Sequence, residues 1–319
     1  MIDFNKANFL VVGLARNCES SIKNDIEKIN NAFSNSNLVK WLVIESDSSD
    51  ETLTILQQLK KDIDLDYSSL GKLADQYPLR TERIALCRNE YLKQIRSNTI
   101  YDEIDYVVVA DLDDVNIMLE STSVEQCWNL NEKWDACFAN QSGPYYDIWA
   151  LRHPLWSPND CYMHENYLKS SGYKDFLARY LAVYSRMITL PSNSKPIQVD
   201  SAFGGLGIYT KEFFNEGSYI GVDSDNNEIC EHVSFHIDRT NNTNLFIIPS
   251  LINCGLNEHS KQSKFYNLFL LFCLSCFMSF HRMQQIRHAY GSNDKLIKFL
   301  KLLIEYLVKL NYFLNVSKN

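Results

Sequence analysis

The sequence predicts an α/β protein built on a doubly wound sheet flanked by helices. Short apolar runs alternate with amphipathic stretches over the first two thirds of the 319 residues. Their order, strand, helix, strand, helix, helix, strand, is typical of such a sheet. Apolar residues make up 45% of the chain and aromatic residues 13%, which is ample material for a core.

The first elements follow from hydrophobic periodicity. FLVVGLA (9–15) and WLVIES (41–46) predict buried strands. A helix is expected between them, with Ser20 or Ser21 as its cap and apolar residues at helical spacing: Ile22, Ile26, Ile29 and Phe33. Further helices are expected around 51–60 and 81–96, and the latter leads into the strand of DYVVVADLD.

The middle of the chain is less regular. DACFAN (135–140), YDIWALR (146–152) and LFIIPSL (245–251) predict strands, the last ended by proline, whereas 153–195 is a mixed region. VDSAFGGLGIY (199–209) is a strand pattern interrupted by Gly204 and Gly205. A glycine pair there indicates either a close approach of the backbone to another group or a bulge.

Three carboxylates follow an apolar run in VVVADLDDV, residues 107–115. Asp111, Asp113 and Asp114 would repel one another by roughly 1 kcal/mol per close pair even near a surface. One interpretation is an acidic turn that faces water. The other is a site for Mg²⁺ or Mn²⁺, which prefer hard oxygen ligands and can neutralise a diphosphate.

Charge is divided unevenly along the chain. Residues 261–319 carry nine lysines and arginines against two acidic residues, so this tail has a net charge of +7 and residues 1–260 carry −15. An acidic body argues against nucleic-acid binding, which relies on positive surface. Nine cysteines without paired spacing indicate reduced thiols in a cytoplasmic protein.

The tail predicts a separate helical extension, 261–319, after a body of residues 1–260. FYNLFLLFCLSCFMSF (265–280) has 16 residues, whereas a spanning helix needs about 20. KLIKFLKLLIEYLVKLNYFL follows with lysines along one side. This helix either lies on an anionic membrane surface, at the inner face of the cytoplasmic membrane, or packs on the body.

Taken in order, the motifs VVGLARN, VIESDSSDET, RIALCRN, YVVVADLDD, AFGGLGIY, CEHVSFH and IIPSLINCGLNEH resemble nucleotide-sugar-dependent glycosyltransferases of the GT-A fold. The resemblance covers roughly residues 8–260 and is greatest to bacterial and fungal enzymes that build capsule, lipopolysaccharide or other surface glycans. It implies a GT-A-like, Rossmann-type mixed sheet. It also implies a UDP- or GDP-sugar donor, a glycan or lipid-linked acceptor, and Mn²⁺ or Mg²⁺.

The resemblance also implies roles for individual residues. ADLDD looks like the DxD motif, in which Asp113 would bind the metal, and the histidine after IIPSL, His259, looks like a second metal ligand. CEHV looks like the motif that carries the catalytic base of inverting members, which places that base at Glu231. The remaining motifs imply a nucleotide-sugar site formed by Ala15, Arg16, Glu45, Asp47, Asp111, Leu112, Gly204 and Gly205.

Other residues have both a functional and a structural interpretation. Arg83 and Arg88, on the helix before the DxD strand, either reach the nucleotide or are structural. Five further residues are candidates for acceptor or supporting contacts, with hydrogen bonding inside the protein as the alternative: Asp114, Asp147, Asp200, His232 and His236.

Two other functions are compatible with the pattern. A haloacid dehalogenase-type phosphatase would use the first aspartate of DLDD as its nucleophile, although that motif normally opens its domain. The second alternative to a transferase is a catalytically inactive protein that binds sugars or docks on membranes. Whether a transferase would invert or retain configuration is left open by the sequence.

Overall fold

The computed structural model describes residues 2–239, 243–256 and 260. The chain divides into two compact units, Met1–Asp160 with Thr189–Asn257 and Cys161–Ile188 with Glu258–Asn319. The helical tail expected over 261–319 and the metal ligand expected at His259 lie outside the described residues.

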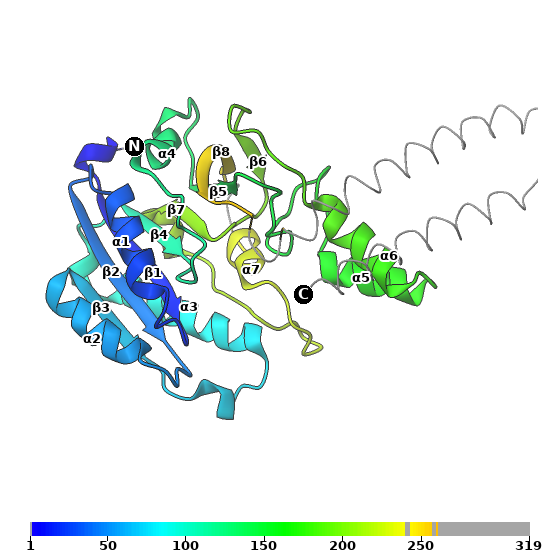
Figure 1. Cartoon of the computed structure of the whole chain (residues 1–319), viewed down its shortest axis with the longest axis horizontal. Coiled ribbons are helices and arrows are strands. Elements are labelled where there is room, and N and C mark those ends of the chain that lie inside the picture. Colours follow the sequence, from blue (N-terminus) through cyan, green and yellow to red (C-terminus); the bar gives the residue numbers. More distant parts are fainter. Residues whose placement is uncertain (1, 240–242, 257–259, 261–319) are drawn as a thin grey trace, which may run out of the picture. The chain divides into compact units, whose positions relative to one another are not determined.

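The first unit is built on one mixed sheet of eight strands in the order β3-β2-β1-β4-β7-β5-β8-β6 (Figure 1). β1, β2, β3 and β4 are mutually parallel, and β7 joins β4 to β5 by antiparallel pairing on both sides. β8 is parallel to β5, and β6 is antiparallel to β8. The predicted α/β class with a mixed sheet flanked by helices is confirmed. The strands are β1 Asn8–Ala15, β2 Leu38–Glu45, β3 Leu65–Ser69, β4 Tyr106–Ala110, β5 Ala136–Gln141, β6 Ile197–Val199, β7 Leu206–Thr210 and β8 Leu245–Cys254.

Helices lie on both faces of this sheet (Figure 1). Phe9 and Val11 of β1 belong to one apolar cluster with residues of α1 and α2. Because side chains alternate along a strand, Leu10 and Val12 face the other side, where α3 contacts β1 and β2. Each such side chain, fully buried, stabilises the fold by about 1.5–3 kcal/mol. The helices of this unit are α1 Ile22–Ala32, α2 Thr52–Asp62, α3 Arg80–Ser97, α4 Ser121–Val124 and α7 Glu231–Ile237.

Short 3₁₀ helices connect several of these elements, namely Phe4–Lys6, Leu73–Asp75, Thr99–Tyr101, Glu125–Asn129 and Lys211–Asn215. Another, Tyr184–Arg186, belongs to the second unit.

Two predicted strands take a different form. Residues 146–152 form turns and an isolated bridge at Arg152, because Asp147 bonds to the backbone nitrogens of Ala150 and Gly204 instead of lying in a ladder. The stretch 199–209 is split between β6 and β7, and the glycine pair lies in the loop that separates them.

β8 continues past Pro249, where the sequence predicted its end. The register with β5 shifts between Phe138 and Asn140, and the side chain of Asn140 donates a hydrogen bond of 2.9 Å to the Pro249 carbonyl. Proline, which has no N–H to donate, is tolerated at such an irregularity. β3, an edge strand with a mainly polar sequence, LDYSS, was not predicted.

The second unit contains a helical pair within the region that the sequence left as mixed. α5 spans Cys161–Ser170 and α6 spans Asp175–Ala182. Glu165, whose side chain is 4% exposed, forms ion pairs with Lys169 at 2.8 Å and Arg179 at 2.9 Å. This buried carboxylate therefore ties the two helices together.

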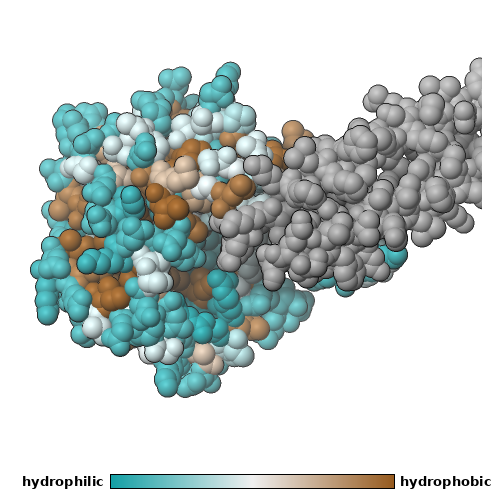
Figure 2. Space-filling model, viewed as in Figure 1, coloured by the Kyte–Doolittle hydropathy of each residue, from teal (hydrophilic) through white to brown (hydrophobic). Residues whose placement is uncertain are grey.

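No helix within the described ranges is long and apolar enough to cross a membrane. On the face drawn in Figure 2, hydrophilic residues cover most of the described surface, with hydrophobic residues in scattered patches.

Candidate functional site

A cleft of about 440 Å³ opens at the carboxyl ends of the parallel strands β1, β2 and β4. This is the end of an open α/β sheet at which ligands usually bind, and the volume lies in the range of small-molecule sites. Its lining includes nine of the residues predicted for the site: Ala15, Arg16, Asp47, Arg83, Arg88, Asp111, Leu112, Asp113 and Glu231. Two of the secondary candidates, Asp147 and His232, also line it.

The acidic turn follows β4 directly and places Asp111 and Asp113 in the cleft. Burial raises the pKa of Asp111 well above its ordinary value, and repulsion from Asp113 raises it further. Arg88 opposes both effects. Two carboxylates therefore lie close together in the cleft, and a cation bound there would relieve their mutual repulsion.

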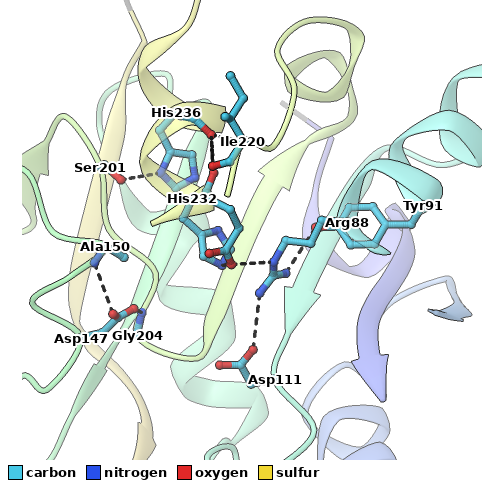
Figure 3. Close-up of polar contacts among 12 residues, drawn as sticks. Arg88, Tyr91, Asp111, Asp147, Ala150, Ser201, Gly204, Ile220, His232 and His236 are labelled. Carbon is cyan, nitrogen blue, oxygen red and sulfur yellow. Dashed lines mark hydrogen bonds and ion pairs between the residues drawn. The ribbon is translucent and has the colours of Figure 1, made fainter. Parts of the chain in front are cut away.

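Arg88, on α3, connects the acidic turn to α7 (Figure 3). Its Nε donates a 3.0 Å hydrogen bond to Oε1 of Glu231, and its Nη2 lies 3.7 Å from Oδ1 of Asp111. Its Nη1 donates to the Tyr91 hydroxyl at 3.3 Å, and the guanidinium lies over the ring of Phe203. Arg88 is only 5% exposed. The side chain is therefore committed to contacts within the protein.

Glu231 is the first residue of α7 and is buried against Arg88. Its neighbour His232 stacks on Phe203, with ring centroids 3.9 Å apart. Burial lowers the pKa of His232 well below its ordinary value, and the positive charge of Arg88 adds to this effect. Both imidazole nitrogens are buried without a hydrogen-bond partner among the described residues, and Nε2 lies 3.7 Å from Oε1 of Glu231. The cleft is therefore lined by the Glu231 carboxylate with the neutral imidazole of His232 beside it.

The turn after β2 forms another wall of the cleft. Asp47 has a positive φ of 61°, and its Oδ1 accepts a 2.8 Å hydrogen bond from the backbone nitrogen of Ala74. Arg83 lies with its Nε 3.7 Å from Oδ2 of Asp47 and donates to the carbonyls of Tyr77 and Pro78. Asp47 and Arg83 thus brace each other at the edge of the site.

The glycine pair shapes the backbone behind the acidic turn. Gly204 and Gly205 have φ of 70° and 87°, a region that side chains disfavour. The carbonyl of Gly205 accepts a 3.0 Å hydrogen bond from the Asp111 backbone nitrogen, and Oδ2 of Asp147 accepts one of 2.9 Å from that of Gly204. A Cβ at position 205 would come within 2.9 Å of the Tyr146 hydroxyl. These glycines support the turn and the cleft wall without lining the cleft themselves.

Four other predicted residues do not line the cleft. Glu45 is buried and accepts hydrogen bonds from the Ser48 backbone and the Ser69 hydroxyl. His236 lies between the Ser201 and Tyr209 hydroxyls at 2.8 and 2.9 Å. Asp200 is exposed, and Asp114 is exposed at the far end of the acidic turn.

Several cleft residues were not predicted as ligand contacts. Arg80 is exposed at the start of α3, as Arg16 is just after β1, so both guanidinium groups are accessible. A basic residue at a predicted helix start was the available signal for Arg80. Tyr146, Phe203 and Cys230 also line the cleft. Their positions depend on loops whose course no local pattern specifies.

Asp111 and Asp113 could hold a cation whose remaining ligands are phosphate oxygens of a substrate and water. Among the described residues, no three His, Cys, Asp or Glu side chains form a group that could hold a metal ion. The crowding of negative charge at Asp111 and Asp113 nevertheless suits Mg²⁺ or Mn²⁺. Mg²⁺ commonly binds through one or two carboxylates together with substrate phosphates and water.

No protein-family model matches the sequence, and no curated protein sequence is significantly similar to it. Similar solved structures include residues 1–349 of S. aureus TarS in complex with UDP-GlcNAc, with 15% identity, a TM-score of 0.43 and coverage of 84% of this chain and 66% of the other. The mannosyltransferase PcManGT from Pyrobaculum calidifontis, in complex with GDP-Man and Mn²⁺, matches with 13% identity, a TM-score of 0.40 and coverage of 78% and 56%.

A further similar structure is glucosyl-3-phosphoglycerate synthase from Mycobacterium tuberculosis, in complex with Mn²⁺, UDP and phosphoglyceric acid. It matches with 13% identity, a TM-score of 0.39 and coverage of 78% of this chain and 67% of the other. A second structure of the TarS 1–349 fragment is covered to 64%, just under two thirds, and a structure of S. aureus TarS with a longer chain is covered to 39%.

Proposed function

We propose that the chain is a metal-dependent glycosyltransferase that moves a sugar from a UDP- or GDP-sugar to a glycan or lipid-linked acceptor. Its place would be in the synthesis of a surface polysaccharide or lipopolysaccharide, on the cytoplasmic side of the membrane. The observation that carries the proposal is the meeting of Asp111, Asp113, Arg88 and Glu231 in one cleft at the carboxyl end of the sheet.

Each part of the cleft has a role in this reaction. Asp113, with Asp111 beside it, would hold Mn²⁺ or Mg²⁺ against the diphosphate, and His259 is the proposed additional ligand. When bound, the cation would neutralise charge on the departing nucleoside diphosphate. Arg16 and Arg80 at the mouth of the cleft would contact the phosphates. Asp47 and Arg83 would border the base and ribose.

Glu231 is the proposed base of an inverting mechanism. Its carboxylate would accept the proton of the acceptor hydroxyl as that oxygen attacks the sugar. Arg88 would hold the Glu231 carboxylate in place through the 3.0 Å hydrogen bond. A retaining enzyme would not need this base, so loss of transfer on substitution of Glu231 would support the inverting course.

The phosphatase alternative finds less support in the order of the elements. Its nucleophile motif normally opens the domain, whereas β1, β2 and β3 with their helices precede the strand before Asp111. The other alternative is a protein that binds sugars or docks on membranes and catalyses no reaction.

A panel assay separates the three functions. The purified protein is incubated with Mn²⁺ and UDP- or GDP-sugars, and separately with phosphate monoesters. We expect slow, Mn²⁺-dependent hydrolysis of one donor, with release of UDP or GDP. Release of phosphate from the monoesters would instead indicate the phosphatase, and no turnover of either class would indicate the inactive binding protein.

A further inference from the structure

The acidic turn is held by α1 on both sides of Asp113. The Ser21 hydroxyl donates a 2.8 Å hydrogen bond to the carbonyl of Leu112, the residue before Asp113. Oδ2 of Asp25 accepts a 3.0 Å hydrogen bond from the backbone nitrogen of Asp114, the residue after it. Ser21, the N-cap of α1, and Asp25, in its first turn, therefore fix both neighbours of the proposed metal ligand.

Asp25 is an unusual residue for its position. Its exposed fraction is 0%, and its Oδ1 has no hydrogen-bond partner in the part of the chain that the structure describes. Burying a carboxylate with one oxygen unsatisfied is costly, so an apolar side chain would serve packing better. Burial raises the pKa of Asp25 to about 7, and repulsion from Asp114 and Asp113 adds to the effect. A role beyond packing would account for this residue.

Asp25 accepts its hydrogen bond from a residue with an unusual backbone conformation, Asp114. Asp114 has a φ of 66°, in the left-handed region that a non-glycine residue adopts only at some cost. Leu112 is 3% exposed and packs so closely on β1 that a Cβ at Gly13 would lie 2.8 Å from its Cδ1. The hydrogen bond to Asp25 thus stabilises a strained turn whose other end is anchored in the core.

We propose that Ser21 and Asp25 are positioning residues that set the orientation of Asp113 toward the cation. The inference rests on the proposed function and deepens it, because it names what prepares the metal ligand. Without either contact the turn relaxes from its left-handed conformation, and the carboxylate of Asp113 no longer stays where the cation and diphosphate need it.

The test compares three variants of the full chain with the wild type: Ser21→Ala, Asp25→Ala and Asp25→Asn. The readout is the Mn²⁺ concentration that half-saturates binding of UDP or GDP, measured by calorimetry. We expect Ser21→Ala and Asp25→Ala to raise it about tenfold or more, as removal of supporting contacts does at metal sites. Asp25→Asn is expected to stay near the wild-type value, because its amide oxygen accepts the same hydrogen bond.

Ile29→Ala is the matched control, since Ile29 is also 0% exposed and lies one turn further along α1. It is expected to lower stability and leave the Mn²⁺ requirement unchanged. If Ile29→Ala raises the requirement as much as Asp25→Ala, the effect is one of stability and the inference is wrong. It is equally wrong if Ser21→Ala and Asp25→Ala keep the wild-type requirement. A wild-type protein without Mn²⁺-dependent nucleotide binding overturns the proposed function and the inference together.

Discussion

Glu231 combines two features that bear on catalysis, its position in the cleft and its bond to Arg88. Glu231→Gln keeps the size of the side chain and removes the base. If the enzyme inverts configuration, donor binding should persist while sugar transfer falls by about 100-fold or more. Donor affinity by calorimetry and turnover in a coupled assay measure the two effects.

Glu212→Gln supplies the control for this prediction, because Glu212 is exposed and does not line the cleft. Unchanged turnover in Glu231→Gln would show that the enzyme retains configuration or that its base lies elsewhere.

Asp25 makes the stability of the protein depend on pH. Its pKa is about 7 in the folded protein and near 3.8 when unfolded, so between these values the folded state holds a proton that the unfolded state releases. Raising the pH through this window therefore lowers the free energy of unfolding. Asp25→Asn has no such proton, and its stability relative to the wild type should rise between pH 5 and pH 8.

Urea unfolding at several pH values measures this difference. Glu27→Gln, on the exposed face of the same helix, is the control for loss of a carboxylate in contact with water. A difference between Asp25→Asn and the wild type that stays constant with pH would contradict the assignment.

Among the elements, α3 carries the charge that joins the acidic turn to α7. Arg88→Ala leaves Glu231 buried without its partner, and breaking a buried ion pair in this way costs about 3–5 kcal/mol. The double variant Arg88→Met with Glu231→Gln removes both charges and should regain much of that loss. Lys93→Ala breaks an exposed pair on the same helix and should cost less than about 1 kcal/mol.

Urea unfolding at neutral pH gives these free energies. If Arg88→Ala is as stable as Lys93→Ala, the buried pair does not have the structural role assigned to it.

Periodicity predicted the elements whose sequence is strongly amphipathic or apolar. α1, α2, α3 and the central strands lie within a few residues of their expected ranges, because their side chains face a core on one or both sides. β3 was missed because three of its five residues are Asp or Ser, and β2 is its only partner among the described strands. The prediction of a strand at 146–152 was wrong. Its aliphatic residues are buried, but the backbone that carries them forms turns and not a strand.

The sequence predicted the cleft residues that directly follow the end of a strand. It did not predict residues whose position depends on a contact with a distant segment. Asp111 and Asp113 followed from the end of β4. Ser20 or Ser21 was expected to cap α1. Ser21 takes the N-cap position, but its hydroxyl makes no capping bond and donates to Leu112, 91 residues away. Arg88 was expected to reach either the nucleotide or the protein. Its partners, Glu231 on α7 and Asp111 just after β4, depend on how distant segments meet.

At the scale of the whole molecule, the charge asymmetry gives a prediction for localisation. Each basic residue near an anionic membrane surface contributes about 1 kcal/mol, and salt screens the attraction. With a net charge of +7 on residues 261–319, the full-length protein should sediment with anionic liposomes at low salt and much less at high salt or with neutral lipids. Binding that ignores lipid charge, or no binding, would rule out electrostatic docking.

For the whole protein, we expect the acidic cleft to bind a nucleotide through a divalent cation. Calorimetry of UDP and GDP binding, in Mn²⁺ and again after chelation, tests it most directly. We expect one nucleotide to bind in Mn²⁺, the affinity to fall at least about tenfold after chelation, a loss of 1.4 kcal/mol or more, and Asp113→Asn to abolish the difference. Equal affinity with and without the cation, or an Asp113→Asn protein that responds to Mn²⁺ as the wild type does, would contradict the account.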